Sequence, residues 1–421
     1  MSSYVISSVT LPDDTVTDLF VQGGRFVAER PTGAEVIEAD GLRALPGLVD
    51  LHVHLREPGR EDAETVASGS SAAARGGFTA VFAMANTQPV TDTAETAERI
   101  LDLGAAAGHC QVFPIGAITK GLAGKELAEM LLMHRSRAGV SVFSDDGSCV
   151  MDAGLMRRAL EWVKPFDGVL AQHSQDASLA GPSACCHEGE LSGRLGLPGW
   201  PPVAESVIIA RDAALAEATG ARLHVCHIST AEGVDVVRWA KKRGVRITAE
   251  ATPHHIYLDT SNLSGYDTTF KVNPPLRTSE HIEAVRDALT DGTIDIIATD
   301  HAPHAPQDKD HAFVDARPGM LGLEQALAVV QEVMVDSGRL TWAEVAERMS
   351  HAPARIGKAA GQGRPIAVGE PANVVLLDPS RRAVVDRGNT ASRSHNNPYH
   401  GRDLPDPVEL TMWQGRITHR R

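Results

Sequence analysis

The sequence has 421 residues, of which 43% are hydrophobic and 4% aromatic, and its formal net charge is −14. This length suits a barrel of roughly 200 to 300 residues with a smaller appended domain. The acidic balance argues against nucleic acid or an anionic membrane as a partner.

The five cysteines are odd in number and have no CxxC spacing. Together with an N-terminus that lacks the apolar run of a signal peptide, this predicts a protein of the reducing cytoplasm. The neighbouring Cys185 and Cys186 could form a redox or metal-binding pair, but adjacent cysteines in a loop are more often reduced thiols.

Both ends of the chain are rich in β-forming residues separated by Gly and Pro turns, as in 372–378. We expect residues 1–49 and 366–421 to form one composite β-sandwich. The barrel domain would then span residues 50–365.

Between these ends, eight short runs of β-branched residues are mostly followed by helical segments such as 92–107 and 205–219. The runs are 48–54, 79–86, 111–118, 140–146, 168–174, 222–229, 246–252 and 295–300. Strands and helices that alternate eight times predict an α/β fold, a (β/α)8 TIM barrel, with catalytic groups at the carboxyl ends of the strands. A doubly wound open sheet is the alternative, but it gives no reason for polar residues at so many strand ends.

Histidines and aspartates close several of these runs. His52 and His54 share one face of the first strand because side chains repeat every two residues, although among 18 histidines an HxH pair arises by chance roughly once. His173, His227 and Asp300 end three further strands. Imidazoles with a carboxylate suit Zn²⁺, so their joint placement predicts a metal centre.

Two metal ions require a bridging ligand, and the run 140–146 ends in two aspartates. If Val142 and Ser144 face the barrel interior, Asp146 does so too, whereas Asp145 points toward the helices. Asp146 is therefore the predicted bridge, and Asp145 is expected to form a local hydrogen bond.

These segments resemble the dihydroorotases of the amidohydrolase superfamily, and specifically the bacterial class in which an aspartate bridges the metals. The resemblance runs essentially from end to end. Its motifs are GLVDLHVHLREPG at 47–59, MANTQP at 84–89, SDDG at 144–147, LSGRLG at 191–196, NPPLR at 273–277 and TDHAPH at 299–304.

The resemblance implies two zinc ions, one held by His52, His54 and Asp300 and the other by His173 and His227, with Asp146 joining both. It also implies the reversible hydrolysis of the ring amide of (S)-dihydroorotate to N-carbamoyl-L-aspartate, a step of pyrimidine biosynthesis. A hydroxide bridging the metals would attack the amide, and Asp300 would shuttle the proton. Hydantoinases, allantoinases and other dihydroorotases use a carboxylated lysine as the bridge, and the run 140–146 contains no lysine.

Arg56 follows the HxH pair by two residues, and its guanidinium could bind the substrate carboxylate through two hydrogen bonds. The resemblance adds Asn86 and His304 as carboxylate contacts, and it implies further substrate contacts from His54, Asn273, Pro318 and Gly319. Arg56 could instead form a structural ion pair, and Asn86 could be a turn residue. His301 and the pair His254 and His255 are assigned to packing or to the support of metal ligands.

The polar segment 305–318 has no periodicity and is interpreted either as a mobile lid or as an ordinary surface loop. After it, Thr341 and Glu344 have the spacing of a capping box, which predicts a helix that extends to about residue 349.

Two other functions are compatible with the fold. One is a cyclic amidase for hydantoin or allantoin, whose neutral rings give Arg56 nothing to bind. The other is a catalytically silent homologue that serves as a structural partner of aspartate transcarbamoylase, although such homologues lose metal ligands. The resemblance also implies a homo-oligomer, a dimer, and association with aspartate transcarbamoylase.

Overall fold

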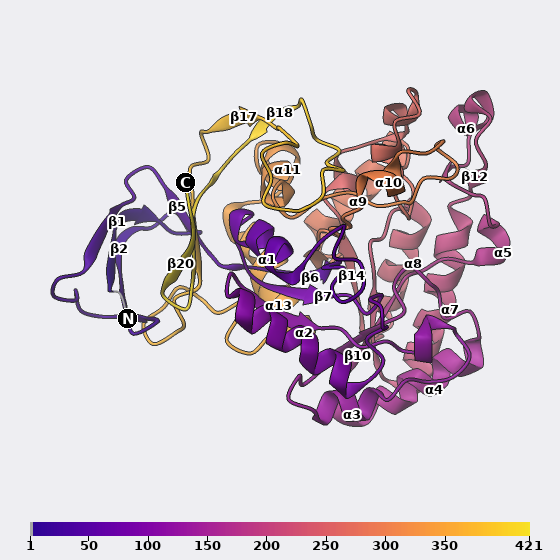
Figure 1. Cartoon of the computed structure of the whole chain (residues 1–421), viewed down its shortest axis with the longest axis horizontal. Helices are drawn as coiled ribbons and strands as arrows, with labels where there is room; N and C mark the ends of the chain where they lie inside the picture. Colours follow the sequence, from indigo (N-terminus) through magenta and orange to yellow (C-terminus); the bar gives the residue numbers. More distant parts are fainter. Residues whose placement is uncertain (1–2) are drawn as a thin grey trace.

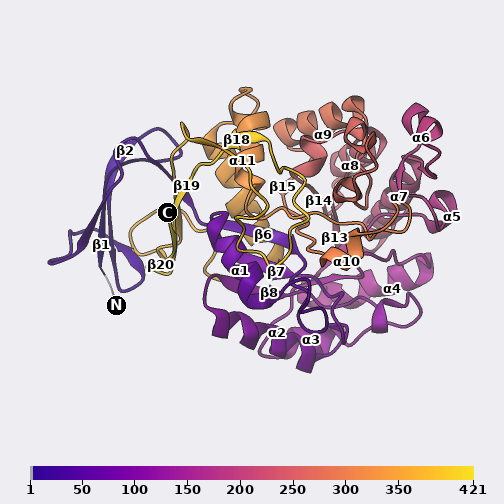
Figure 2. The same ribbon diagram turned by 45° about the horizontal axis from the view of Figure 1, so that its top comes forward.

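A computed structural model describes residues 3–421. Figures 1 and 2 show two parts side by side, a barrel surrounded by helices and a sheet that contains both ends of the chain. Among the described residues, no helix is long and apolar enough to cross a membrane.

Eight parallel strands form the barrel. They are β6 (Leu48–Val53), β7 (Phe78–Ala83), β8 (Gln111–Pro114), β9 (Val142–Ser144), β10 (Val169–Gln172), β13 (Arg222–Val225), β14 (Ile247–Ala251) and β15 (Ile296–Ile297). The strands pair as β6-β7-β8 and as β9-β10-β13-β14-β15. The single bridges Gly116 to Phe143 and Val53 to His301 join the two groups. The ring therefore closes, and the predicted barrel is confirmed.

The strands are buried on both faces, which explains their nearly continuous runs of apolar residues. Leu51, Val142 and Ala171 belong to the cluster that fills the barrel interior. Phe143 and Leu170 belong to the layer between the strands and the helices. Alternate side chains thus divide between two cores.

The principal helices that follow these strands form the outer layer. They are α1 (Val66–Arg75), α2 (Ala94–Ala107), α3 (Met130–Arg135), α4 (Ala153–Val163), α7 (Val203–Thr219), α8 (Ala231–Lys242), α9 (Ser279–Asp291) and α11 (Ala326–Val330), which continues as a π-helical turn, η6 (Gln331–Val335). The helices predicted at 92–107 and 205–219 correspond to α2 and α7.

Thr341 forms the predicted capping box with Glu344 at the start of α12 (Trp342–Ala346). The helix runs on through η7 (Glu347–His351), which is π-helical, and α13 (Ala352–Gly357), so it extends beyond the predicted end at residue 349. Shorter elements lie in the connections. They are α5 (Ala177–Ala180), α6 (Glu190–Leu195), α10 (Pro306–Lys309), the strands β11 (Cys186–His187) and β12 (Gly199–Trp200), and the 3₁₀ turns η1 (Lys120–Leu122), η2 (Lys164–Phe166), η3 (His254–Ile256), η4 (Thr260–Leu263) and η5 (Thr268–Phe270).

The two ends of the chain share one hydrogen-bonded sheet of eight strands. Its strands are β1 (Tyr4–Thr10), β2 (Val16–Gln22), β3 (Arg25–Val27), β4 (Glu35–Glu38), β5 (Arg43–Pro46), β16 (Val374–Leu377), β19 (Val408–Trp413) and β20 (Arg416–Arg420). The antiparallel pairing of β5 with β16 joins the N-terminal strands to the C-terminal ones. Ile6, Val21 and Leu376 belong to a separate apolar core within this sheet. The division at residues 49 and 366 stays a prediction.

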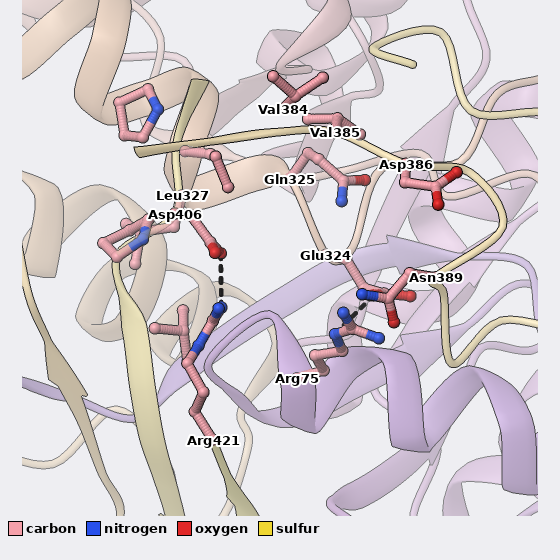
Figure 3. Close-up of a pocket in the computed structure, with 15 residues that line it drawn as sticks. Arg75, Glu324, Gln325, Leu327, Val384, Val385, Asp386, Asn389, Asp406 and Arg421 are labelled. Carbon is pink, nitrogen blue, oxygen red and sulfur yellow. Dashed lines mark hydrogen bonds and ion pairs between the residues drawn. The ribbon is translucent and has the colours of Figure 1, made fainter. Parts of the chain in front are cut away.

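A cavity of about 180 Å³ lies where the barrel helices meet the C-terminal segment, which also carries β17 (Arg382–Val384) and β18 (Asp403–Pro405). Figure 3 shows that charged side chains pair within it, Arg75 of α1 with Glu324 at 3.0 Å and Arg421 with Asp406 at 2.7 Å. None of the predicted site residues lines this cavity. It therefore belongs to the junction of the two parts and not to the site.

Candidate metal centre

The six predicted ligands meet at one end of the barrel, and all are buried. His52 lies within β6 and His54 directly after it, whereas His173 follows β10, His227 follows β13, Asp146 follows β9 and Asp300 follows β15. Because the strands are parallel, their carboxyl ends lie on the same side of the barrel.

Backbone irregularities turn two of the imidazoles inward. In β6 the pairing with β7 shifts between Asp50 and Val53, and such a bulge lets His52 face the site although Leu51 also packs in the barrel interior. Cys226 likewise packs in the interior. The left-handed backbone of His227, with φ 32°, turns the His227 side chain to the same side as that of Cys226. Asp300 has a φ of 47°. Left-handed backbone at non-glycine residues costs about 1–3 kcal/mol each, and it persists where surrounding contacts hold it.

Asp146 lies at the centre of the cluster. Its Oδ1 is 3.5 Å from His52 Nε2, 3.5 Å from His173 Nδ1 and 3.4 Å from His227 Nε2, and its Oδ2 is 3.3 Å from His54 Nε2. The Oδ1 atom of Asp300 is 3.1 Å from His54 Nε2 and 3.4 Å from His52 Nε2. The donor atoms form two close groups, one of His52, His54 and Asp300 and one of Asp146, His173 and His227.

The chemistry of this cluster fits a pair of divalent cations. Among the described residues, His52 Nε2 and Asp146 Oδ1 are buried without a hydrogen-bond partner. Burial opposes the charge on His52, yet Asp146, Glu250 and Asp300 raise its pKa well above the ordinary value. Burial also opposes ionisation of Asp146, but the neighbouring imidazoles hold its pKa well below the ordinary value. A field that favours a proton on His52 also favours a cation between these donors.

Three ligand imidazoles have a second partner on the side away from Asp146. His52 Nδ1 is 2.5 Å from Glu250 Oε1, His54 Nδ1 is 2.8 Å from Asn86 Oδ1, and His173 Nε2 is 2.9 Å from Gln175 Oε1. Such partners fix the tautomer and orientation of a metal-binding imidazole. Neither Glu250 nor Gln175 is among the site residues predicted from the sequence, although a glutamate inside the apolar run 246–252 is a signal for a buried functional group.

The two adjacent aspartates separate as strand alternation predicts. Asp145 points away from the cluster, and its Oδ1 accepts hydrogen bonds from the backbone N–H groups of Ile118 at 2.8 Å and Thr119 at 2.9 Å. These partners lie after β8 and not next to Asp145 in the chain. Asp145 therefore ties β9 to the neighbouring strand, while Asp146 faces the histidines.

Cys226 also lies close to His52 and Asp146. Burial raises the pKa of its thiol far above the ordinary value. Burial therefore favours the neutral thiol, and its place among the apolar residues of the barrel interior is consistent with a packing role.

Arg56 lies beside this cluster, half-buried and with a left-handed backbone at φ 60°. Its Nε donates to the carbonyl of Pro303 at 3.0 Å, and one terminal nitrogen lies 3.5 Å from His304 Nε2. Partial loss of hydration lowers the pKa of Arg56 to about 10, so it is charged at neutral pH. No carboxylate of residues 3–421 lies within 4.0 Å of its guanidinium, which removes the support for a structural ion pair.

His304 is held by the segment that follows it. Its Nε2 lies 2.8 Å from the carbonyl oxygen of Pro318, and its Nδ1 lies 3.3 Å from Asp308. Burial and the charge on Arg56 hold the pKa of His304 well below its ordinary value, so the ring is neutral. Gly319 has a φ of 144°, and a Cβ there would lie 2.7 Å from His304 Nε2. The close approach therefore requires glycine at this position.

Asn273 lies next to Gln175, the partner of His173. Its Nδ2 donates to Gln175 Oε1 at 3.2 Å, while its buried Oδ1 has no partner among the described residues. Both residues line a cavity of about 370 Å³, together with Cys185, Lys271 and Pro318. All five cysteines are free.

The other histidines of this region differ in their contacts. His301 Nε2 lies 3.3 Å from Glu64, and His255 contacts Thr252 and the carbonyl of Pro274. His254 Nε2 is buried without a partner in the described chain, and burial lowers its pKa to about 4. His255 and His301 thus each have hydrogen-bond partners in the structure.

The segment 305–318 contains the short helix α10 and is attached at several points. Lys309 Nζ donates to the carbonyl oxygens of Arg317 at 2.8 Å and Thr268 at 3.0 Å, and Lys271 Nζ donates to that of Val314 at 2.7 Å. Whether the segment moves as a lid stays a prediction.

Comparison with known proteins adds independent information. Residues 42–233 match the family model described as "Dihydro-orotase-like", and residues 187–418 match "Amidohydrolase family". A dihydroorotase from Streptomyces coelicolor is 59% identical over 92% of this chain and 90% of its own length. A second from Leifsonia xyli is 56% identical over 99% and 96%, and a third from Mycobacterium tuberculosis is 50% identical over 93% and 90%.

The chain belongs to the dihydroorotase family. This confirms the predicted family and, with it, the class of enzyme, a metal-dependent hydrolase of cyclic amides. Solved structures share the fold. An L-hydantoinase (dihydropyrimidinase) from Arthrobacter aurescens has a TM-score of 0.88 at 24% identity, with 100% of this chain and 96% of that chain covered. A D-hydantoinase (dihydropyrimidinase) from Thermus sp. has a TM-score of 0.82 at 25% identity, with 99% and 95% covered.

Proposed function

We propose that this dihydroorotase-family chain catalyses the reversible conversion of dihydroorotate to N-carbamoyl-aspartate in pyrimidine biosynthesis. The relatives named dihydroorotase support this reaction. The observation that carries the proposal is the unpaired guanidinium of Arg56 beside the metal cluster. Dihydroorotate has a carboxylate for this group to bind, whereas hydantoin and allantoin rings have none.

We propose two zinc ions as the cofactor, held by the six residues in the two groups described above. Imidazole and carboxylate donors fit zinc. When bound, the ions would lower the pKa of a water molecule to about 7 and polarise the ring amide carbonyl.

The proposed role of Asp300 is proton transfer. Burial works against its ionisation, but His52 and His54 lower its pKa below the ordinary value, so it is a carboxylate at neutral pH. A carboxylate can accept a proton from the attacking water and deliver it to the ring nitrogen as the amide bond breaks. In the reverse direction, the same group would take the proton from the ureido nitrogen.

The remaining contacts orient the ring. Arg56, Asn86 and His304 would bind the carboxylate, and the free Oδ1 of Asn273 can accept a hydrogen bond from a ring N–H. The backbone at Pro318 and Gly319 would also contact the ring. The metal side and the carboxylate side would then hold the ring at two points, which places the scissile amide at the metals.

The deciding experiment compares dihydroorotate, hydantoin and allantoin as substrates of the purified protein, with and without a chelator. We expect ring opening of dihydroorotate alone, lost on chelation and restored by Zn²⁺. Turnover of hydantoin at a comparable rate would contradict the substrate assignment. Dimer formation and association with aspartate transcarbamoylase stay predictions, and light scattering of the protein alone and mixed with aspartate transcarbamoylase would measure both.

A further inference from the structure

Glu250 is a charged residue in the middle of a barrel strand. Ala249 and Ala251 pack in the layer between strands and helices, so alternation along β14 turns Glu250 into the barrel interior. There the side chain is fully buried. The strand lies between β13 and β15 (Figure 2), next to the strand that precedes His227.

The carboxylate of Glu250 accepts three hydrogen bonds. Its Oε1 is 2.5 Å from His52 Nδ1 and 3.2 Å from the backbone nitrogen of His227, and its Oε2 is 3.0 Å from His224 Nε2. Burial favours the neutral acid, but His52 and His224 hold the pKa of Glu250 well below the ordinary value. The backbone N–H of His227 can only donate, so Glu250 Oε1 is an acceptor, and a proton on His52 Nδ1 completes the second hydrogen bond to the same oxygen.

Two of these three hydrogen bonds fix a predicted metal ligand. A proton on His52 Nδ1 leaves Nε2, the atom that faces Asp146 and Asp300, free to bind a cation. The hydrogen bond to the His227 backbone stabilises its left-handed conformation, and that conformation directs the imidazole to the cluster.

We propose that Glu250 is a positioning residue that couples the two halves of the metal centre. It holds His52 of the group with His54 and Asp300, and it also holds His227 of the group with Asp146 and His173. The amide partners Asn86 and Gln175 each contact a single ligand imidazole. The inference rests on the proposed metal ligands of the proposed function and not on the identity of the substrate.

The test is the affinity of the metal-stripped full chain for Zn²⁺, measured in competition with a chromophoric chelator. In Glu250→Gln the side chain keeps its size but loses its charge, and its amide group can favour the other tautomer of His52. We expect both stepwise affinities to fall by about 10- to 100-fold. The visible spectrum of bound Co²⁺ should change with the donor properties of His52. Gln175→Ala removes the partner of a single ligand imidazole, that of His173, and should weaken one step.

Glu205→Gln is the matched control. Glu205 is also a buried carboxylate, and it accepts hydrogen bonds from Ser229 and Thr230 without contact to a metal ligand. Its substitution should lower the midpoint of thermal unfolding and leave the metal affinities unchanged. If Glu250→Gln behaves in the same way, its role is structural and the proposal is wrong.

Loss of only one binding step in Glu250→Gln would overturn the coupling. If this variant does not fold, Glu250→Asp keeps the charge on a shorter side chain, and unchanged affinities there would likewise contradict the proposal. Turnover by Glu250→Gln should recover at saturating Zn²⁺. A wild-type chain that binds two ions but does not open dihydroorotate would refute the proposed function while leaving this inference in place.

Discussion

The metal-binding face and the proposed substrate-binding face of the site satisfy their polar groups in opposite ways. On the metal face, one ring nitrogen of His52, of His54 and of His173 has a hydrogen-bond partner outside the cluster. The other ring nitrogen of each faces the cluster. On the substrate face, Arg56 has no carboxylate and Asn273 Oδ1 has no donor among the described residues. The unpartnered atoms of the metal face suit cations, and the groups of the proposed substrate face suit an anion with an N–H group.

Asp300 has two proposed roles, as a metal ligand and in proton transfer, so its substitution should have the largest effect. Asp300→Asn removes the proposed proton acceptor while keeping the size of the side chain, and we expect turnover of dihydroorotate to fall by about 10²- to 10⁴-fold. Metal content must be measured on the same sample, because loss of a ligand would also lower the rate. An unchanged rate would refute the role in proton transfer.

Arg56→Ala tests the substrate face alone. Loss of a charge-assisted contact worth about 2–3 kcal/mol should lower kcat/KM for dihydroorotate by about 30- to 150-fold. Dihydrouracil, which has the ring without the carboxylate, serves as the control because its slow turnover should not respond to the substitution. Equal losses with both substrates would show that Arg56 supports the fold and not the carboxylate.

Gly319→Ala should have a smaller effect on the same face. The added Cβ would lie 2.7 Å from His304 Nε2 and 2.9 Å from Ala302 Cβ, so the imidazole must shift. We expect KM to rise by several-fold, about 1 kcal/mol in free energy, with two Zn²⁺ ions still bound. A change in metal stoichiometry without a change in KM would contradict the separation of the two faces.

Cys185 offers a test that leaves the chemistry untouched. The hydrogen bond from Cys186 and the charge on Lys271 lower the pKa of its thiol, whereas burial raises the pKa of Cys110 to about 12 and that of Cys149 to about 11. Ellman's reagent should therefore label one thiol fast, with a rate that rises with pH as its thiolate forms. Cys185→Ser should abolish this phase. If the fast phase persists in this variant, another thiol is the reactive one and the prediction for Cys185 is wrong.

The barrel could be predicted from the sequence because eight apolar runs buried on both faces leave few other folds, and the end of each run marks a possible site residue. Alternation also separates Asp146 from Asp145 correctly. Alternation fails at His52, where a shift in strand pairing turns the side chain toward the site. It also fails at His227, where a left-handed backbone has the same effect. Neither irregularity has a local sequence signal, since no glycine occupies these positions.

Glu250 and Gln175 escaped the sequence analysis for a different reason. The role of Glu250 depends on which residues lie across the barrel interior, and His52 and His227 are separated from it in the chain. Gln175 is only two residues from His173, but the sequence does not show that their side chains meet. A glutamate in an apolar run indicates that something unusual is buried there, but the run alone does not reveal that His52 and His227 are its partners. The segment 305–318 likewise contains a short helix that its composition did not reveal.

The bridge between Val53 and His301 closes the barrel between its first and last strands. His54 and Asp300 are the immediate neighbours of that bridge, and 246 residues separate them along the chain. Contacts between such distant residues must overcome the entropy of closing a long loop. A nascent or truncated chain that ends before the last strand would lack Asp300, and with it the complete group of His52, His54 and Asp300, although Asp146, His173 and His227 would all be present. Occupancy of the first group therefore measures how many molecules have closed the barrel, and a bound metal would selectively stabilise those molecules.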